Sequence, residues 1–548
     1  ELHVMRKQYL DGSIPTGFQR TAMVGLTGTI PFRVPELGID RDLSIRQLSL
    51  EEDSCREVSD VGHRITYRTD RLGMPLTEMV TEPEFLTPQE LHAGARLLAQ
   101  LARSTGKVRR GPGAARQDVN VSVAGGRRVE IKGVHHHRKL PLLVHTEAFR
   151  QLNLLRVKSE LERRGLTEDV LPDPPAGLPW KTSPLVLDAE TVLADSNFPP
   201  IREAISRGDT ISAIKLPGFG GILSHPTQPG TTFAHEITDR VRVIACPRHY
   251  PFLTHSDAGR GGLVSRHWKM LARALEADSG DGIVVLWAPE EDSATGVREV
   301  LIRAREALTG IPAETRQARP DGTNGFERIL PGPDRMYPDT DTPPLPIPDS
   351  MVAEVRAQIG EGPWEREARY LGLGLDPRAA KVLSVAPWAV LFDQVAPKEG
   401  EPARRLASSL EKRLPFLMRS TLGRKARTAE ELPDLDRLTL AVRALEAGDL
   451  RPEALPLALD AMVLDPRRPV EDILVRFRPR PEDGAALEEE IGKAVEEAGG
   501  FRIRSLEAAV RWAMGRVMRA FWGRVSPLDV EARIRELMVP KFHREEER

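Results

Sequence analysis

The sequence predicts a multidomain protein of the α+β class, in which a mixed α/β part comes first and a largely helical part follows. The chain has 548 residues, which fits three or four domains at roughly 150 residues per domain. Before residue 350, segments that alternate apolar and polar residues lie between helical patterns. After Ser350, long segments rich in Ala, Leu, Glu and Arg predominate, as is typical of helices.

Composition excludes several other classes. Apolar residues make up 40% and charged residues 29%, with a net charge of -2, so the chain is neither fibrous nor wholly disordered. Its two cysteines, Cys55 and Cys246, cannot build a disulfide framework or a cysteine-based zinc site, which favours a reducing, cytoplasmic location. No stretch approaches the ~18 apolar residues of a membrane span, and the amino end has no signal-peptide core, so we expect no membrane association.

Local charge varies strongly along the chain. Residues 96–139 contain eleven Lys or Arg and two acids, a net of +9, which favours a polyanionic partner. Residues 481–500 contain seven acids and one Lys, a net of -6, and residues 501–524 return to +5. This second swing fits solvated helix faces equally well.

A helix is expected near residues 88–105. Thr87, Pro88 and Glu90 form a capping-box pattern with Pro at the first helical position. Gly106 is a suitable C-terminal stop. The apolar stripe of this helix is Leu91, Ala95, Leu98 and Ala102.

Two alternating segments, 118–123 and 128–132, predict a β-hairpin. The buried face would carry Val119, Val121, Val123, Val129 and Ile131. A three-residue loop at 125–127 would place them together, with Ser122 opposite Glu130 and Asn120 opposite Lys132. The other face would carry Asp118, Asn120, Ser122, Arg128, Glu130 and Lys132. Acids for a metal, bases for phosphate and amides for orientation make this face a candidate site, although a plain solvent face would look similar.

More acids lie upstream: the run from Glu51 to Asp53, Glu78 on a strand expected at 74–80, and Glu82. Magnesium takes oxygen ligands from one or two carboxylates plus nucleotide phosphates. Such acids near Arg71, Arg128 and Lys132 would suit ATP chemistry, although an isolated acidic run is usually just exposed.

Common signatures are absent from the sequence. It contains no G-x-x-x-x-G-K-[ST], G-x-S-x-G or H-E-x-x-H pattern. The glycines of residues 217–221 favour a tight turn over a phosphate loop. The triplet His135, His136 and His137 could bind a transition metal, but no nearby acid or thiol completes a ligand set.

Two helices of the second half have clear apolar stripes. Leu435, Leu438, Val442 and Leu445 keep helical spacing before Gly448. Leu506, Val510, Met514, Val517 and Phe521 do the same.

Several long motifs follow one another along the chain. They are Arg6-Lys7, Asp11-Gly12-Ser13, Gly17-Phe18-Gln19-Arg20-Thr21, Leu50-Glu51-Glu52-Asp53-Ser54, Asp70-Arg71-Leu72-Gly73-Met74-Pro75-Leu76-Thr77-Glu78, Thr81-Glu82-Pro83, Arg116-Gln117-Asp118-Val119-Asn120-Val121-Ser122 and Arg128-Val129-Glu130-Ile131-Lys132-Gly133-Val134. In this order they resemble the family that contains the B-type and E-type subunits of the glutamyl-tRNA(Gln) amidotransferases. The wording of residues 11–21, the Arg335-Met336-Tyr337-Pro338-Asp339-Thr340-Asp341 segment and a large insertion before it favour the archaeal branch, the E-type.

The resemblance implies an organisation and a reaction. Residues 1–193 would form a catalytic cradle, 194–312 an inserted α+β domain similar to that of bacterial aspartyl-tRNA synthetases, and 313–350 a return segment of the cradle. A helical domain, 351–430, and a helical tRNA-binding tail, 431–548, would follow. Such enzymes use ATP and magnesium to phosphorylate the glutamate misattached to tRNA(Gln), and ammonia then displaces the phosphate. Ammonia would come from an asparaginase-like partner, the D-type subunit of the amidotransferase, in a dimer of heterodimers.

The resemblance also implies residue roles. Glu51, Glu52, Glu78, Glu82 and Lys132 would be catalytic, and Glu52, Glu78, Glu82 and Glu130 would hold the metal. Arg71, Asn120, Ser122 and Arg128 would contact the nucleotide. Arg511, Arg516 and Arg519 in the tail would contact tRNA.

Two alternatives stay open. Family members open with a strand that bears a metal-binding Glu and His, and often with a cysteine cluster, and this sequence starts downstream of both. We therefore expect an incomplete cradle, which keeps a non-catalytic tRNA-binding scaffold in play. The second alternative is a B-type enzyme that acts on both aspartyl- and glutamyl-tRNA.

Overall fold

The computed structural model describes residues 1–9, 12, 14–109, 111, 114–134, 136–171, 183–259, 262–330, 335–422, 434–500 and 505–546. Asp11, Ser13 and His135 lie outside them, as do residues 172–177, whose three prolines and one glycine the sequence marks as a candidate domain boundary. The chain forms two compact units, residues 1–97 with 112–352 and residues 98–111 with 353–548. None of the helices in the described ranges is both long and apolar enough to cross a membrane.

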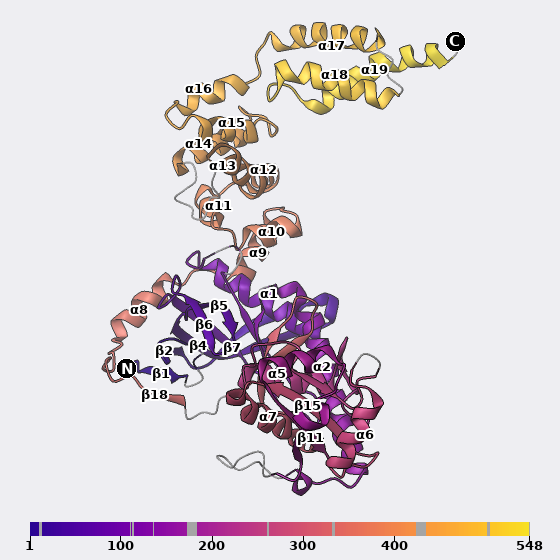
Figure 1. Ribbon diagram of the computed structural model, residues 1–548. Helices are drawn as coiled ribbons and strands as arrows, with labels where there is room; N and C mark the ends of the chain where they lie inside the picture. The colour runs from indigo at the N-terminus through magenta and orange to yellow at the C-terminus, as the bar shows by residue number, and fades with distance from the viewer. Residues whose placement is uncertain are drawn as a thin grey trace. The chain divides into compact units, whose positions relative to one another are not determined.

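The first unit opens with an antiparallel sheet in the order β18-β1-β2-β4-β3, with β7 also paired to β4 (Figure 1). Its strands are β1 (Val4–Gln8), β2 (Phe18–Gly25), β3 (Gly28–Val34), β4 (Ile39–Glu52), β7 (Pro75–Thr81) and β18 (Met336–Pro338). The 14-residue β4 pairs with β2, β3 and β7. A separate hairpin, β5 (Arg56–Val61) and β6 (Arg64–Arg68), joins β4 to β7 in the chain.

The predicted first helix is confirmed as α1 (Pro88–Ser104). The Glu90 N–H donates to Thr87 Oγ1 at 3.1 Å, and the Gly106 N–H donates to the Arg103 carbonyl at 3.1 Å with φ +69°. Gly94 is the buried residue of this helix. It packs closely against Phe85, because a Cβ built at this position would lie only 2.3 Å from the Phe85 ring.

A second sheet has the order β17-β16-β9-β8. Its strands are β8 (Gln117–Val121), β9 (Val129–Val134), β16 (Glu314–Ala318) and β17 (Asn324–Ile329). β9 and β16 are parallel, so the chain returns to this sheet only after the long intervening segment. Helix α2 (Leu140–Arg163) follows β9.

The predicted hairpin is confirmed, but its register is not. Val119, Val121, Val129 and Ile131 are buried on one face, whereas Asn120 pairs with Glu130 and the loop covers residues 122–128. The three-residue loop was therefore wrong, and Ser122 and Arg128 lie outside the ladder. The cause is Gln151 of α2, whose side chain accepts from the Val123 N–H at 3.1 Å and donates to the Val121 carbonyl at 3.0 Å.

The intervening segment forms a third sheet, in the order β10-β11-β15-β14, with helices around it. Its elements are β10 (Val186–Asp188), α3 (Glu190–Leu193), α4 (Pro199–Arg207), β11 (Thr210–Leu216), β12 (Pro226–Gln228), β13 (Thr231–Thr232), α5 (Phe233–Ile244), β14 (Leu253–His255), α6 (Ser265–Ala274), β15 (Gly282–Ala288) and α7 (Glu290–Thr309). Because β10 pairs with β11, this sheet starts before Ala194. The expected tight turn follows β11, with Gly218 at φ +73°.

One apolar core joins this segment to the second sheet. It contains Val129 of β9 and Leu154 and Val157 of α2 together with Ile214 and Val284 of the third sheet. The inserted segment therefore shares its core with the part of the chain that flanks it.

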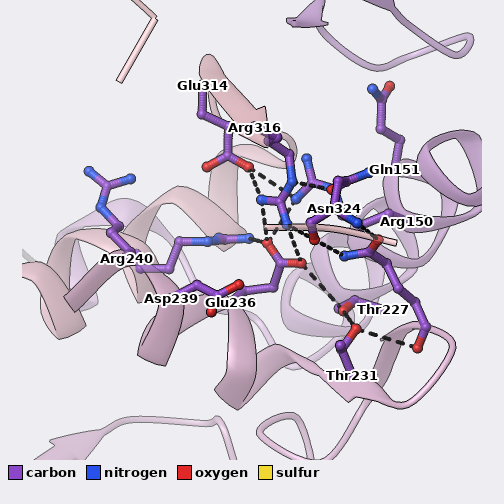
Figure 2. A network of polar contacts seen from close by, with 12 residues as sticks. Arg150, Gln151, Thr227, Thr231, Glu236, Asp239, Arg240, Glu314, Arg316 and Asn324 are labelled. Atoms are coloured by element: carbon purple, nitrogen blue, oxygen red, sulfur yellow. Dashed lines mark hydrogen bonds and ion pairs between the residues drawn. The ribbon is translucent and has the colours of Figure 1, made fainter. Parts of the chain in front are cut away.

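A buried network of charges also crosses this junction (Figure 2). Glu147 accepts from Arg150 Nε at 2.9 Å and from Asn324 Nδ2 at 3.0 Å. Arg150 Nη1 donates to Glu236 at 2.8 Å, and Arg316 Nη1 donates to the same carboxylate at 3.1 Å. Burial alone would raise the pKa of Glu236, but Arg150, Arg316 and Arg303 lower it to about 2. Glu236 therefore stays charged, and the network ties α2, α5 and β16 together.

The second unit is helical, as predicted. Its helices are α9 (Pro363–Gly372), α10 (Pro377–Leu383), α11 (Ala389–Val395), α12 (Glu401–Ser408), α13 (Leu414–Leu422), α14 (Leu435–Glu446), α15 (Leu455–Leu464), α16 (Val470–Leu474), α17 (Asp483–Gly500), α18 (Leu506–Phe521) and α19 (Pro527–Glu546). α8 (Asp349–Gln358) carries the chain into this unit. Both predicted stripes are confirmed: Val442 and Val517, for example, are fully buried.

The helices form two cores. One core unites α9–α16, and the other belongs to α17–α19. Helices α14, α15 and α16 therefore share a core with α9–α13, and the expected start of the tail at residue 431 stays a prediction.

We expect Glu147→Gln to lower the free energy of unfolding by up to about 3–5 kcal/mol, because Arg150 would lose one of its three buried carboxylate partners. The matched control is Glu162→Gln on the same helix, whose ion pair with Lys158 spans 3.6 Å at the surface. That change should cost under about 1 kcal/mol. Urea denaturation measures both, and equal effects would contradict the role of the network.

Candidate active site

Polar side chains gather on one face of the first sheet. Thr21 pairs with Glu51, and Ser49 pairs with Glu78, across β2, β4 and β7. Side chains alternate between faces along a strand, so these four residues point the same way. Lys7 of β1 extends to the same face, because its ammonium contacts Glu51.

The lysine lies between two carboxylates. Lys7 Nζ forms an ion pair with Glu51 and lies 3.9 Å from Glu78 Oε2. Thr21 Oγ1 donates to Glu51 Oε1 at 2.8 Å. The side chains of Glu51 and Lys7 are 9% and 15% exposed, whereas Glu78 is 45% exposed. Glu51 is therefore fixed, and Glu78 remains open to a ligand.

A charge on the second sheet also affects the pKa of Glu78. Partial burial raises the pKa of its carboxyl, and the nearby charges of Glu51 and Asp118 raise it further against the opposing effect of Lys7. Asp118 of β8 accepts from the Gly133 N–H at 3.1 Å. Acids from both sheets thus approach one another here.

The second sheet adds its own polar groups. Lys132 Nζ lies 3.9 Å from Asp118 and 4.0 Å from Glu130. Thr315 Oγ1 donates to Glu130 at 3.2 Å. Burial raises the pKa of the Glu327 carboxyl on β17, with Asp118 and Glu130 adding to the rise against Arg328 and Lys132.

We call this set of residues the cradle cluster. Its members are Lys7, Glu51, Glu78, Asp118, Glu130, Lys132, Glu327 and Arg328. Five carboxylates face three cations, so the cluster has an excess of negative charge. An excess of this kind, with raised carboxyl pKa values, suits a divalent cation with oxygen ligands.

Two predicted metal ligands lie apart from Glu78. Glu52 is on the opposite face of β4, where Arg20 Nη2 donates to it at 2.6 Å. Glu82 follows the end of β7, and its N–H donates to the Ser44 carbonyl at 3.0 Å. Among the described residues, no three of Glu52, Glu78, Glu82 and Glu130 offer ligand atoms within 4.8 Å of one another.

The predicted nucleotide-binding residues occupy different places. Arg71 Nε lies 3.7 Å from the buried Asp53, which also pairs with Arg116 at 3.0 Å. Asn120 and Arg128 are exposed, the former beside Glu130 in the ladder. Ser122 is exposed in the hairpin loop.

The tail arginines lie on α18. Arg511, Arg516 and Arg519 are all exposed there. Arg516 pairs with Glu497 at 2.9 Å and with Glu490 at 3.4 Å, both on α17. The acidic stretch thus neutralises part of the basic one.

The histidine triplet belongs to no metal set in the described part of the chain. His137 stacks on His92 of α1, with ring centroids 5.4 Å apart. Burial, with Arg96 and Arg138 nearby, lowers the pKa of His92.

Sequence reasoning gave no role to three members of the cradle cluster: Lys7, Glu327 and Arg328. Lys7 is part of a quoted motif, but its role depends on the pairing of β1 with β2 and of β2 with β4. Glu327 comes from β17, which begins 203 residues after the end of β8, a separation that no local pattern reveals.

Comparison with known proteins decides the family. The model of the GatB/GatE catalytic domain matches residues 1–353. The chain belongs to the GatB/GatE family. The resemblance seen in the sequence motifs is thereby confirmed, whereas the likeness of the inserted segment to aspartyl-tRNA synthetases stays a prediction.

Similar proteins in archaea are named as the E-type subunit of glutamyl-tRNA(Gln) amidotransferase. The Methanopyrus kandleri protein is 37% identical over 76% of this GatB/GatE chain, and the Pyrococcus furiosus protein is 32% identical over 94%. The Pyrobaculum calidifontis protein is 33% identical over 98%. The matches span 63%, 77% and 81% of those three proteins, respectively.

We expect Glu78→Gln to leave the unfolding midpoint at pH 7 unchanged or to raise it, because it removes like-charge repulsion with Glu51 and Asp118. A carboxyl whose folded pKa is raised favours the folded state when protonated, so the advantage of the amide should shrink as the pH falls through the raised pKa of Glu78 and should be gone below about 4.5. Thermal unfolding from pH 3 to 8 measures this, with Glu162→Gln as control. A large loss of stability at pH 7 would show that Glu78 is structural.

Proposed function

We propose that this GatB/GatE chain activates the side chain of glutamate attached to tRNA(Gln) and converts it to glutaminyl-tRNA(Gln). The names of the archaeal relatives support an amidotransferase role that acts on charged tRNA. The observation that carries the proposal is the cradle cluster, in which Lys7 lies between Glu51 and Glu78 within an excess of carboxylates.

The chemistry requires activation because a carboxylate has no good leaving group. The γ-phosphoryl group of ATP moves to a side-chain carboxylate oxygen, the bond to the β-phosphate oxygen breaks, and ADP leaves. Ammonia then attacks the carbonyl carbon, and phosphate departs with the electrons of the C–O bond. The attacking nitrogen loses one proton, and the product is the side-chain amide.

The residues fit a role for magnesium and nucleotide. Glu78, with Asp118 and Glu51 beside it, would hold the metal, and the raised pKa of Glu78 reflects its burial first and the two neighbouring acids second. Bound magnesium would neutralise phosphate charge in the transferring group. Lys132 and Arg71 would orient phosphate oxygens, and the ion pair with Lys7 would hold Glu51 in place.

Ammonia would be supplied by another protein. The sequence has no G-x-S-x-G signature or other recognised nucleophile for amide hydrolysis. We therefore propose an asparaginase-like protein, the D-type subunit of the amidotransferase, as the partner, with a dimer of heterodimers as the assembly.

The test is ATP hydrolysis with and without glutamyl-tRNA(Gln), with magnesium and free ammonia supplied. We expect stimulation by the charged tRNA and glutaminyl-tRNA as product. Glu78→Gln should lower turnover more than about 100-fold, since even outer-shell changes at metal sites cost about 10–100-fold. Glu52→Gln, on the other face of β4, should cost less, and Glu162→Gln should have no effect.

Other outcomes would overturn the proposal. Retained tRNA binding without turnover would indicate a non-catalytic scaffold. Equal conversion of aspartyl-tRNA would indicate a B-type enzyme.

The tail is proposed to hold the tRNA backbone. Replacing Arg511 and Arg519 by Gln should weaken tRNA binding and reduce the salt slope of log K by roughly 0.7–0.9 per lost phosphate contact. Adding Arg516→Gln should change less, because Glu490 and Glu497 already neutralise Arg516. Filter binding across a series of salt concentrations measures the slope, and an unchanged slope would place the tRNA contact elsewhere.

A further inference from the structure

A group of three potential ligands lies away from the cradle cluster. His63 is in the turn between β5 and β6, and Glu291 and Asp292 lie in the first turn of α7. One ligand atom from each lies within 4.8 Å of the others. It is the one such group of His, Cys, Asp and Glu in the part of the chain that the structure describes.

Asp292 is held at this spot in an unusual way. Its side chain is 1% exposed, and its Oδ1 lies 2.6 Å from His63 Nε2. Its Oδ2 is buried with no hydrogen-bond partner. A buried carboxylate oxygen without a partner carries a desolvation penalty that a bound cation would remove.

Ordinary helix capping does not explain the geometry. Acids in the first turn of a helix are usually stabilised by its free N–H groups. Asp292 instead turns toward His63 on a distant hairpin, and the α7 N-cap residue, Pro289, makes no side-chain cap bond.

We propose that His63, Glu291 and Asp292 bind a divalent transition-metal ion, with Zn²⁺ as the probe. An imidazole nitrogen with two carboxylates matches zinc, whereas magnesium and calcium prefer oxygen ligands alone. Metal binding would replace the direct contact between His63 Nε2 and Asp292 Oδ1 and would satisfy the buried Oδ2. Three protein ligands leave a position for water.

The metal ion would link two segments that are far apart in the sequence. His63 belongs to the hairpin that follows the central strand β4, and the two acids belong to the inserted segment. A metal bridging them would fix the hairpin against the start of α7, independently of the reaction in the cradle cluster.

Two neighbouring residues, Arg248 and Cys246, affect the expected affinity of the site for Zn²⁺. Arg248 Nη2 lies 3.8 Å from the exposed Glu291, and its side chain passes over Gly62 in the hairpin turn. This cation competes for Glu291. Burial raises the pKa of the Cys246 thiol, with Asp60 and Asp292 adding to the rise, so the thiol is not an extra anionic ligand.

The experiment is a Zn²⁺ titration of the untagged full chain against a chromophoric chelator, in excess magnesium. The background chain carries His136→Ala and His137→Ala, which weakens any binding by the histidine triplet. We expect one Zn²⁺ per chain, and His63→Ala and Asp292→Asn should each weaken binding more than about 10-fold. Arg248→Gln should tighten it.

Controls separate this site from the cradle cluster and from misfolding. Glu78→Gln should leave Zn²⁺ binding unchanged, and circular dichroism should show that each variant folds. Zn²⁺ should raise the thermal midpoint of the background chain but not that of Asp292→Asn. No bound Zn²⁺, or binding that survives Asp292→Asn, would overturn the proposal and leave a metal-free contact between His63 and Asp292.

Discussion

The buried network of arginines and glutamates is the constraint on which the first unit depends. Glu147, Glu236 and Glu314 face Arg150, Arg303 and Arg316, all almost fully buried. Ionised groups are tolerated in such a place only when opposite charges offset one another. Here three carboxylates offset three guanidinium groups, although Arg303 contributes through its charge at 3.9 Å from Glu236 and not through a hydrogen bond. Because these residues come from α2, α5, α7 and β16, this balance of charges fixes where β16 lies beside β9. That position in turn brings Thr315 to Glu130 at the edge of the cradle cluster.

The cradle cluster differs from this network, because its negative charges are not offset by an equal number of cations. Its acids are incompletely paired, so burial and like charge raise the pKa values of Glu78 and Glu327. Groups of this kind lower stability and are typical of sites that receive a cationic or phosphorylated ligand. The same unit therefore contains a balanced network for structure and an unbalanced one for chemistry.

The second unit explains the charge swing near the end of the sequence. Acids of α17 pair with arginines of the next two helices: Glu497 with Arg516 of α18, and Glu488 with Arg533 of α19 at 3.2 Å. Much of the swing is thus internal to the bundle. Fewer arginines of α18 are left for a polyanion than the sequence alone suggests.

The sequence alone determined the elements and the family, because alternation, capping and apolar spacing depend on neighbouring residues. The capping box before α1, the buried face of Val119 and Val129, and the stripe of α14 all follow from such local rules. The register of the β8–β9 hairpin did not follow from local rules. At the end of β8, the side chain of Gln151 from α2 takes hydrogen bonds that a longer ladder would have used. The partners of Glu78 did not follow from local rules either, because they lie on strands paired through long-range contacts. Only tertiary structure decided which carboxylates share a face and which, like Glu52, point away.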